Sequence, residues 1–176
     1  MAIQIGAKLD SGFDDPIGML KDCHRRIEHF LDILCLVAER AHTRSLTGEE
    51  QSAAKAALQY FYVGGERHTA DEEESLFPRL RAKPSVGLEE IDRLESDHHL
   101  AADLHESVDR LYTVWSSAGV LQQDEQQRLL SQTRQLKELY AEHIQVEERI
   151  VFPHALQTLD RRTIVAIGQE FRSRRG

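Results

Sequence analysis

One motif occurs twice in this chain and restricts its fold more than any other feature of the sequence. Residues 68–78 read HTADEEESLFP, and residues 143–153 read HIQVEERIVFP. The two copies share His, Glu, Glu, Phe and Pro at a constant offset of 75 residues. On an α-helix, positions i and i+4 lie one turn apart on the same face, so each copy presents an imidazole and a carboxylate together. The repeat therefore predicts a helical fold with two matching sets of metal ligands.

The repeat also indicates which carboxylate accompanies each histidine. Glu72 and Glu147 follow it by four residues, whereas Glu73 and Glu148 follow it by five and are rotated by about 140° around the helix. We interpret Glu72 and Glu147 as the ligands. Glu73 and Glu148 are either hydrogen-bond partners that orient a histidine N–H or solvated charges. Asp71 is also within reach of the first site, but the second copy has valine there, which favours Glu72.

The composition is that of an ordinary globular protein, and the length predicts one domain or two very small ones. Of the 176 residues, 40% are hydrophobic and 30% are charged, and runs rich in Glu, Gln, Leu, Ala and Arg with only four prolines favour helix. The net charge of −8 opposes binding to a phosphate backbone, and basic residues gather only in the tail, residues 172–175. We therefore expect no nucleic-acid partner.

No segment of the sequence has the pattern of a membrane anchor or a secretion signal. The N-terminus lacks a charged stretch followed by a long apolar one, and no window reaches the roughly 18 apolar residues that span a bilayer. Cys23 and Cys35 lie on one predicted helix, about 18 Å apart along its axis, which is too far for a disulfide. Reduced thiols and the missing signals predict a cytoplasmic protein without membrane association.

Capping signals and apolar periodicity predict five helices after a flexible lead-in, residues 1–13. In Asp14-Asp15-Pro16 an acid caps the first helix, and Thr47-Gly-Glu-Glu50 has the spacing of a capping box. Four long helices with short connections favour an all-α, antiparallel up-down-up-down four-helix bundle. A short C-terminal fifth helix covers one end, and residues 14–176 form a single domain. The helices are predicted from Pro16 to about His42, from Thr47 to an exit at Pro78, from about Leu88 to Ser116, from about Gln122 past the second motif, and from about Arg161 to Arg172, with a linker at residues 81–87.

Each helix carries an inward-facing stripe, and polar residues interrupt the stripes of the four long helices. The stripe of the first helix contains His24 and matches that of the third helix at an offset of 74, which pairs His24 with His98. The motif offset of 75 would instead select His99. We favour His98, because at 75 three leucines of the first stripe fall on acidic residues, whereas one additional loop residue costs little. The predicted stripes are Ile17, Leu20, His24, Ile27, Leu31, Leu34, Ala38 and Ala41; Ala54, Leu58, Phe61, Gly65, His68, Glu72 and Ser75; Ile91, Leu94, His98, Ala101, His105, Val108, Tyr112 and Trp115; Leu129, Thr133, Leu136, Tyr140, His143, Glu147 and Ile150; and Ile164, Ile167 and Phe171.

Six polar side chains on these stripes are expected at the centre of the bundle. Burying two carboxylates without a compensating charge costs several kcal/mol each, so a cation is expected between them. Imidazole with carboxylate suits iron better than magnesium or calcium, and four histidines would also accept zinc. The candidate metal ligands are His24, His68, Glu72, His98, His143 and Glu147.

The order of these residues, His … His-x-x-x-Glu … His … His-x-x-x-Glu with both motifs leading into Phe-Pro, resembles the hemerythrin-like HHE cation-binding domain family. The resemblance covers residues 14–172. It implies an antiparallel bundle that holds two iron ions, joined by carboxylates and by an oxo or hydroxo bridge. It further implies that the four histidines are terminal ligands, that Glu72 and Glu147 bridge, and that a position on each iron stays open to dioxygen, peroxide, azide or nitric oxide.

Two departures from the oxygen-carrying hemerythrins bear on function. Their third helix supplies two histidines four residues apart, but here Ala102 follows His98 at that spacing. Their fourth helix pairs its histidine with an aspartate five residues later, where this chain has a glutamate at four. A centre with four histidines is more symmetric, which argues against a reversible carrier.

The sequence predicts a non-haem di-iron protein that binds or senses dioxygen or a related small ligand, with a di-iron peroxidase or oxidase as the alternative.

Two further hypotheses remain open from the sequence alone. A ferritin-like centre needs Glu-x-x-His on two helices, and only Glu95 with His98 and Glu39 with His42 have that spacing. Alternatively, a metal-free bundle that binds a protein partner would retain the same residues without using them.

The remaining polar aromatic residues are assigned by their place relative to the stripes. His105 is interpreted as a core polar group with a partner, and a ligand role is the alternative. Tyr140 is interpreted as a packing residue or as a hydrogen-bond donor to a bound ligand. His29, His42 and His99 lie off the stripes and are predicted to face solvent.

Overall fold

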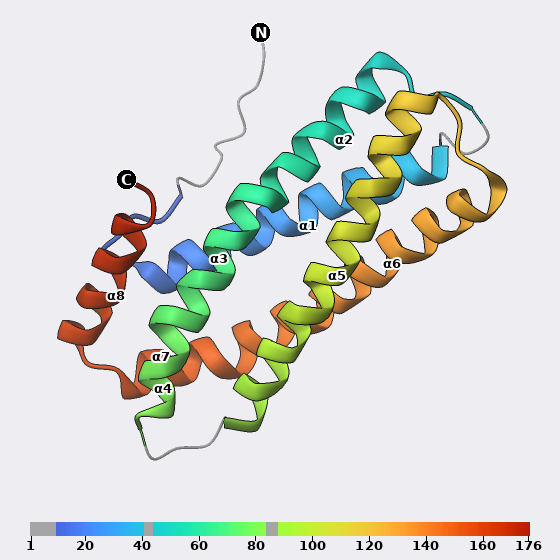
Figure 1. The fold of residues 1–176 in the computed structure, drawn as a ribbon. Helices are drawn as coiled ribbons and strands as arrows, with labels where there is room; N and C mark the ends of the chain where they lie inside the picture. Colours follow the sequence, from blue (N-terminus) through green and yellow to red (C-terminus); the bar gives the residue numbers. More distant parts are fainter. Residues whose placement is uncertain (1–9, 41–43, 84–87) are drawn as a thin grey trace, which may run out of the picture.

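The computed structural model describes residues 10–40, 44–83 and 88–176, and all regular secondary structure in these ranges is helical (Figure 1). Three π-helical turns continue the helices without a break, so that α2 to α4 form one helical run and α6 to α7 another. The elements are α1 (Pro16–Arg40), α2 (Gly48–Tyr60), η1 (Phe61–Gly65), α3 (Glu66–Asp71), η2 (Glu72–Leu76), α4 (Phe77–Arg81), α5 (Leu88–Ala118), α6 (Gln123–Val146), η3 (Glu147–Val151), α7 (Phe152–Thr158) and α8 (Arg161–Ser173).

The predicted helix starts are confirmed by their capping hydrogen bonds. The Asp15 carboxylate accepts from the N–H of Gly18 at 2.9 Å in the first turn of α1. Thr47 and Glu50 form the reciprocal capping box at the start of α2. The Asp160 carboxylate accepts from a backbone N–H in the first turn of α8 at 2.8 Å. Each cap pairs a donor that the helix itself leaves unpaired.

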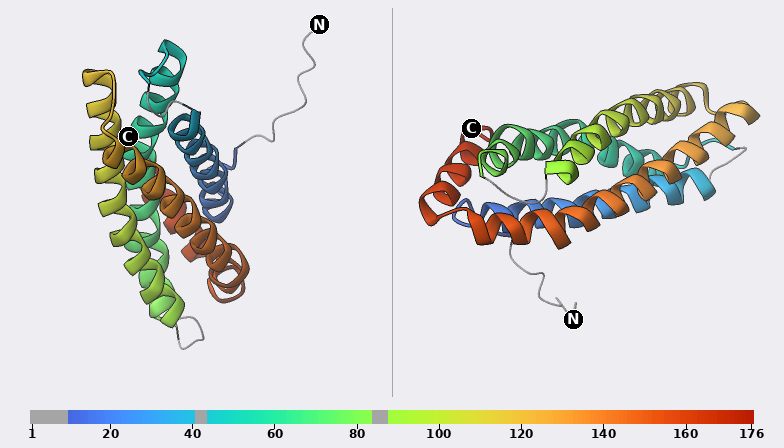
Figure 2. Two further views of the ribbon diagram at one scale, coloured as in Figure 1. Left: turned by 90° about the vertical axis from the view of Figure 1, so that its right-hand side faces the viewer. Right: turned by 90° about the horizontal axis from the view of Figure 1, so that it is seen from below.

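The long helical runs lie side by side, and α8 crosses one end of them (Figures 1 and 2). α1 packs along both α2 and α6, and α5 packs along α6. In contrast, α2 and α5 make few contacts with each other. α8 lies against α1 and the η2 turn, which confirms the predicted fifth helix at one end of an all-helical bundle.

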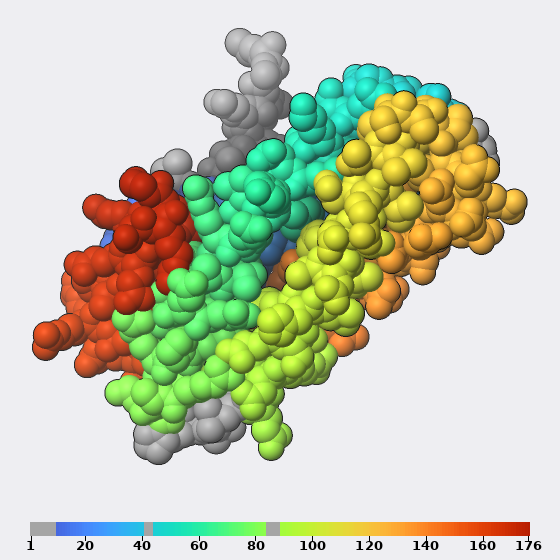
Figure 3. All heavy atoms as spheres, in the orientation of Figure 1, coloured from blue at the N-terminus to red at the C-terminus, as the bar shows by residue number. Residues whose placement is uncertain are grey.

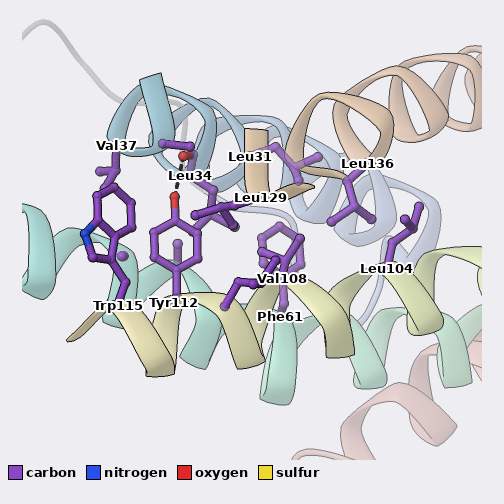
Figure 4. Close-up of a cluster of buried hydrophobic side chains, with 14 of the residues drawn as sticks. Leu31, Leu34, Val37, Phe61, Leu104, Val108, Tyr112, Trp115, Leu129 and Leu136 are labelled. Atoms are coloured by element: carbon purple, nitrogen blue, oxygen red, sulfur yellow. Dashed lines mark hydrogen bonds between the residues drawn. The ribbon is translucent and has the colours of Figure 1, made fainter. Parts of the chain in front are cut away.

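The apolar interior consists of two separate clusters. The α8-end core includes Leu20, Leu94 and the α8 residue Phe171, and the far-end core includes Ile27 and Ala101. Both α1 and α5 pass from one core to the other, and the residues between them include the predicted histidine ligands of these two helices. In the far-end core the Tyr112 hydroxyl donates to the carbonyl of Leu34 at 2.6 Å (Figure 4).

The Phe-Pro pairs do not end their helices, which corrects the exit predicted at Pro78. The helices continue beyond Pro78 to Arg81 and beyond Pro153 to Thr158. A proline inside an α-helix clashes with the carbonyl four residues earlier. Here a π turn precedes each proline, and the phenylalanine N–H bonds to the carbonyl of the motif glutamate five residues earlier. This wider turn accommodates the proline ring.

The same π turn corrects one predicted core position. Ile150 was expected to face inward, but it is 42% exposed, whereas the next residue, Val151, is 3% exposed. A π turn accommodates one additional residue and so shifts all later residues around the helix. Because η3 begins at Glu147, the stripe moves by one position after it.

Part of the predicted flexible lead-in is held against the bundle. The N–H of Ser11 donates to the buried carboxylate of Asp22 on α1. The guanidinium of Arg172, on α8, lies 4.9 Å from the centre of the Phe13 ring. Residues 10–13 are therefore ordered by contacts with α1 and α8.

Several sequence predictions concern residues outside the described ranges. These are residues 1–9 of the lead-in, residues 84–87 of the linker, and Ala41 and His42 at the predicted end of the first helix. Within the described residues, no helix has both the length and the apolar composition needed to cross a membrane.

Candidate metal centre

The structure brings all six predicted side chains to one buried place between the two cores. His98 joins this cluster, whereas His99 is exposed, so the offset of 74 selected the residue that lies at the centre. The exposed fractions are 1% for His24, 2% for His68, 0% for Glu72, 9% for His98, 3% for His143 and 0% for Glu147.

Glu72 lies between imidazoles from two different helices. One carboxylate oxygen, Oε1, is 3.3 Å from Nε2 of His68, one turn earlier in the same run. The other, Oε2, is 3.4 Å from Nε2 of His98 on α5. The carboxylate therefore spans the distance between two nitrogen ligands.

Glu147 repeats this arrangement from the opposite run. Its Oε2 is 3.0 Å from Nε2 of His24 on α1 and 3.4 Å from Nε2 of His143, one turn earlier. The internal repeat of the sequence is thus also a repeat of the contacts.

The four imidazoles form two pairs. The ring centres of His24 and His68 are 5.1 Å apart, and those of His98 and His143 are 4.7 Å apart. Each carboxylate contacts one member of each pair, so two nitrogen pairs are joined by two carboxylates. Ligand atoms within 4.8 Å of one another form two sets that share Glu72, the first with His24, His68 and Glu147 and the second with His98 and His143.

These side chains contain eight buried nitrogen or oxygen atoms without a hydrogen-bond partner. Buried polar atoms are nearly always paired in folded proteins, so a concentration of unpaired atoms in one place requires an explanation. Imidazole nitrogens and carboxylate oxygens are ligand atoms for transition metals, and the residues therefore fit a metal centre. The atoms are Nε2 of His24, His98 and His143, Nδ1 of His68, and both carboxylate oxygens of Glu72 and Glu147.

Glu73 and Glu148 hold two of the imidazoles from outside. Nδ1 of His24 is 2.8 Å from the carboxylate of Glu148, and Nδ1 of His98 is 2.7 Å from that of Glu73. A carboxylate at this nitrogen fixes the proton there and leaves the Nε2 lone pair directed at the centre. Of the two roles that the sequence left open for these acids, the geometry favours orientation of a histidine.

Asp97 is a third outer acid, which the sequence reasoning did not identify. Its carboxylate lies 3.5 Å from Nδ1 of His143. The repeat gives no signal for it, because the offset of 74 that pairs His24 with His98 pairs Asp97 with Cys23. The sequence offered one indication that Asp97 lies near the centre, namely its position directly before His98.

The two central carboxylates have opposite pKa shifts. Burial and the nearby Glu147 carboxylate raise the pKa of Glu72 well above its usual value. Burial acts in the same direction on Glu147, but His143 and His24 outweigh it and hold the pKa of Glu147 well below its usual value. In the absence of a cation, a proton on Glu72 therefore relieves the repulsion between the two acids.

The pKa values of the imidazoles are also shifted in opposite directions. Burial and repulsion by neighbouring imidazoles lower the pKa of His68 and of His98, so both are neutral, as a metal ligand must be. Burial acts to lower the pKa of His143, but Glu147 and Asp97 outweigh burial and raise it.

His105 and Tyr140 form a pair next to the centre. Nε2 of His105 is 3.2 Å from the Tyr140 hydroxyl, and its ring packs against Phe61 at 4.3 Å. Burial lowers the pKa of His105 to about 4, so its imidazole is neutral. His105 is thus a polar group with a partner, as interpreted from the sequence. The Tyr140 ring centre is 6.3 Å from that of His143.

Asp71 faces away from the centre, towards α8. Its carboxylate is fully buried and lies 2.9 Å from the guanidinium of Arg174 and 2.6 Å from that of Arg175. Arg174 also reaches Glu74 at 3.1 Å. Asp71 therefore lies outside the cluster and contacts the residues that follow α8, whereas Glu72 lies within the cluster.

The other histidine patterns do not contribute ligands in the part of the chain that the structure describes. Glu95, of the ferritin-like spacing, binds Arg81 at 2.5 Å, away from the cluster. His29 is exposed, as predicted.

Residues 15–155 match the family model described as the hemerythrin HHE cation binding domain. The matched range contains all six side chains of the cluster and most of the chain. None of the curated proteins matches the sequence.

Proposed function

Because this chain belongs to the hemerythrin HHE cation-binding domain family, we propose that it is a non-haem di-iron protein that binds dioxygen or a related small ligand, such as peroxide or nitric oxide. One observation carries the proposal: two buried carboxylates each lie between imidazoles of two different pairs, with their oxygen atoms unpaired. In the proposed centre the two imidazole pairs would hold the ions together with the carboxylates of Glu72 and Glu147. The fold we propose is the antiparallel up-down-up-down bundle, with residues 14–176 as one domain, because the repeat relates its two halves.

The chain's own residues orient and shield this centre. When bound, two iron ions supply open coordination positions and exchangeable electrons for a small oxidant. Glu73 and Glu148 hold the Nδ1 protons of His98 and His24 and thereby aim the opposite nitrogens inward. The two apolar cores cover the site at either end along the bundle. The proposed partner is a small molecule rather than a nucleic acid or a membrane, in keeping with the net charge of −8.

Metal analysis with an optical spectrum tests this proposal. Protein loaded with iron without oxygen and then reoxidised is expected to contain two irons per chain. It is also expected to absorb in the near ultraviolet and visible, with bands that shift on addition of azide. Zinc is the competing metal for four histidines, and a colourless zinc protein that retains no iron after loading would contradict the proposal.

Metal retention is expected to decrease as the pH falls. Glu72 and His143 have raised pKa values without a metal, so each keeps its proton to a higher pH and must lose it before a metal binds. Binding therefore releases protons, and acid reverses it. The measurement is metal content after dialysis between about pH 8 and about pH 5. Constant content over this range would show that protons do not compete with the metal.

A catalytic role is the second candidate, and the His105–Tyr140 pair is the observation that favours it. The Tyr140 hydroxyl contacts a neutral imidazole and its residue lies near His143, so the pair would be a proton-transfer group beside the centre. Such a protein would be a di-iron peroxidase or oxidase. Consumption of hydrogen peroxide far beyond the iron present distinguishes turnover from stoichiometric binding.

A further inference from the structure

A groove of about 1210 Å³ lies between the α2–α3 run and α5. Figure 3 shows the hollow between these two elements, with atoms of α1 visible in its depth. One end of the groove reaches His98 and Glu73 at the metal centre, and the other reaches Lys55 and Ser116. Lys55 and Glu73 are separated by roughly 27 Å along a helix at 1.5 Å per residue, so the groove is long.

A difference between the two copies of the repeat explains why the groove is open. The repeat relates the contact between α1 and α6 to that between α5 and α2, yet the first pair is closely packed and the second makes few contacts. At the motif offset of 75, Gly64 and Gly65 stand where the second copy has Leu139 and Tyr140. Of the two glycines only Gly65 lines the groove, whereas Gly64 faces the Tyr60 ring, so the first copy lacks one large side chain at the middle of the groove.

Gly65 is not required by the backbone. Its φ of −64° and ψ of −48° are ordinary helical values. A Cβ atom added there would meet only the Phe61 side chain, at 3.7 Å and beyond, which is ordinary van der Waals contact. The effect of glycine at this position is to leave space in the groove.

The lining has an apolar middle and an acidic end. Leu58, Phe61, Ala101 and Tyr112 form apolar parts of the wall. Acidic side chains outnumber basic ones in the lining. Glu66 and Glu73 lie towards the metal centre, as does Glu74, which is paired with Arg174. The lysine lies at the far end. The charged residues of the lining are Glu66, Glu73, Glu74, Glu106 and Asp109 against Lys55.

We propose that this groove binds an elongated apolar organic molecule with one positively charged amine, its apolar body along the middle and its amine at the end next to the metal centre. The volume far exceeds the needs of dioxygen or peroxide and suits a ligand of drug size or larger. The acidic lining repels carboxylates and phosphates. A second copy of the chain fits less well, because it carries a net charge of −8 itself. The inference goes beyond the di-iron proposal and does not require the metal.

Calorimetry with three probes of equal chain length tests the inference: n-octylamine, n-octanol and octanoate at neutral pH, below their micelle concentrations. The amine is expected to bind the full-length protein at least about tenfold more tightly than the carboxylate, with the alcohol between them. Gly65→Tyr, which restores the residue of the second copy, is expected to weaken amine binding about tenfold or more. Val63→Tyr, in the same π turn but outside the groove lining, is the matched control and is expected to change it by no more than about twofold.

Equal binding of amine and carboxylate, or no binding of any probe, would overturn the inference. Unchanged amine binding to Gly65→Tyr would also overturn it. If Gly65→Tyr changes the oligomeric state and neither the wild type nor the variant binds the amine, the groove is an interface between copies and the inference is wrong. Ala102→Phe blocks the groove from the exposed α5 wall and replaces Gly65→Tyr if that variant does not fold. Iron content, measured on the same samples, reports on the metal proposal separately.

Discussion

Replacing the two proposed central carboxylates together, Glu72→Gln with Glu147→Gln, is expected to abolish iron binding while the metal-free protein still folds. An amide keeps the volume of the side chain but removes the negative charge that a bridging ligand supplies. In the metal-free protein a proton on Glu72 relieves the repulsion between the two acids, so Gln replaces a neutral group there. Glu147→Gln removes the acid that is paired with His143, so some loss of stability is expected from that change. With metal at a thousandfold excess over its dissociation constant, the wild type gains about 4 kcal/mol, and the double variant should lose this gain.

The measurement is iron per chain, together with urea unfolding of both proteins with and without metal. Glu73→Gln with Glu148→Gln is the matched control, because these acids contact only the outer nitrogens of His98 and His24. This control is expected to retain metal with an affinity lowered about 10- to 100-fold. A Glu72/Glu147 double variant with the iron content of the wild type would refute the assignment of the ligands.

Asp71→Ala is expected to produce the largest loss of fold stability among the single changes considered, about 2–3 kcal/mol. It leaves Arg174 and Arg175 without their buried carboxylate and detaches the end of α8 from the turn that carries Glu72. Breaking a fully buried ion pair costs roughly 3–5 kcal/mol. The two arginines retain 19% and 22% exposure, so water compensates part of this cost.

Urea unfolding of the metal-free protein measures the effect of Asp71→Ala. Glu74→Ala is its control, since Glu74 binds the same Arg174 but is 66% exposed, and it is expected to cost less than about 0.5 kcal/mol. Equal losses from the two variants would show that burial of Asp71 does not strengthen the contact with α8.

The parts of the centre that sequence could predict follow from helical spacing. His and Glu four residues apart share a face of a helix, and the repeat gives this spacing twice, so the sequence could predict that Glu72 and Glu147 lie in the cluster. His98 was chosen over His99 because the apolar stripe of α5 had to match that of α1, and the structure has the same phase. Caps such as Thr47 were predictable because they depend on local hydrogen bonds alone.

The features that sequence could not predict arise from contacts between helices or from backbone hydrogen bonds that span five residues instead of four. No residue pattern predicts the π turns at Glu72 and Glu147. These turns nevertheless let the helices continue past both prolines, and the second turn exposes Ile150 to solvent. Asp97 depends on how α5 and α6 pack against each other. The groove departs from the symmetry of the repeat, which by itself predicts that α2 and α5 pack as closely as α1 and α6.

The division of the apolar interior into two clusters gives the metal centre a mechanical role. Each cluster can hold its own end of the molecule, but the layer between them consists of charged and polar groups, eight of whose buried atoms have no hydrogen-bond partner. An ion at that layer fastens all four helical runs at the same height. We therefore expect a bound metal to make the two ends of the protein unfold as one cooperative unit.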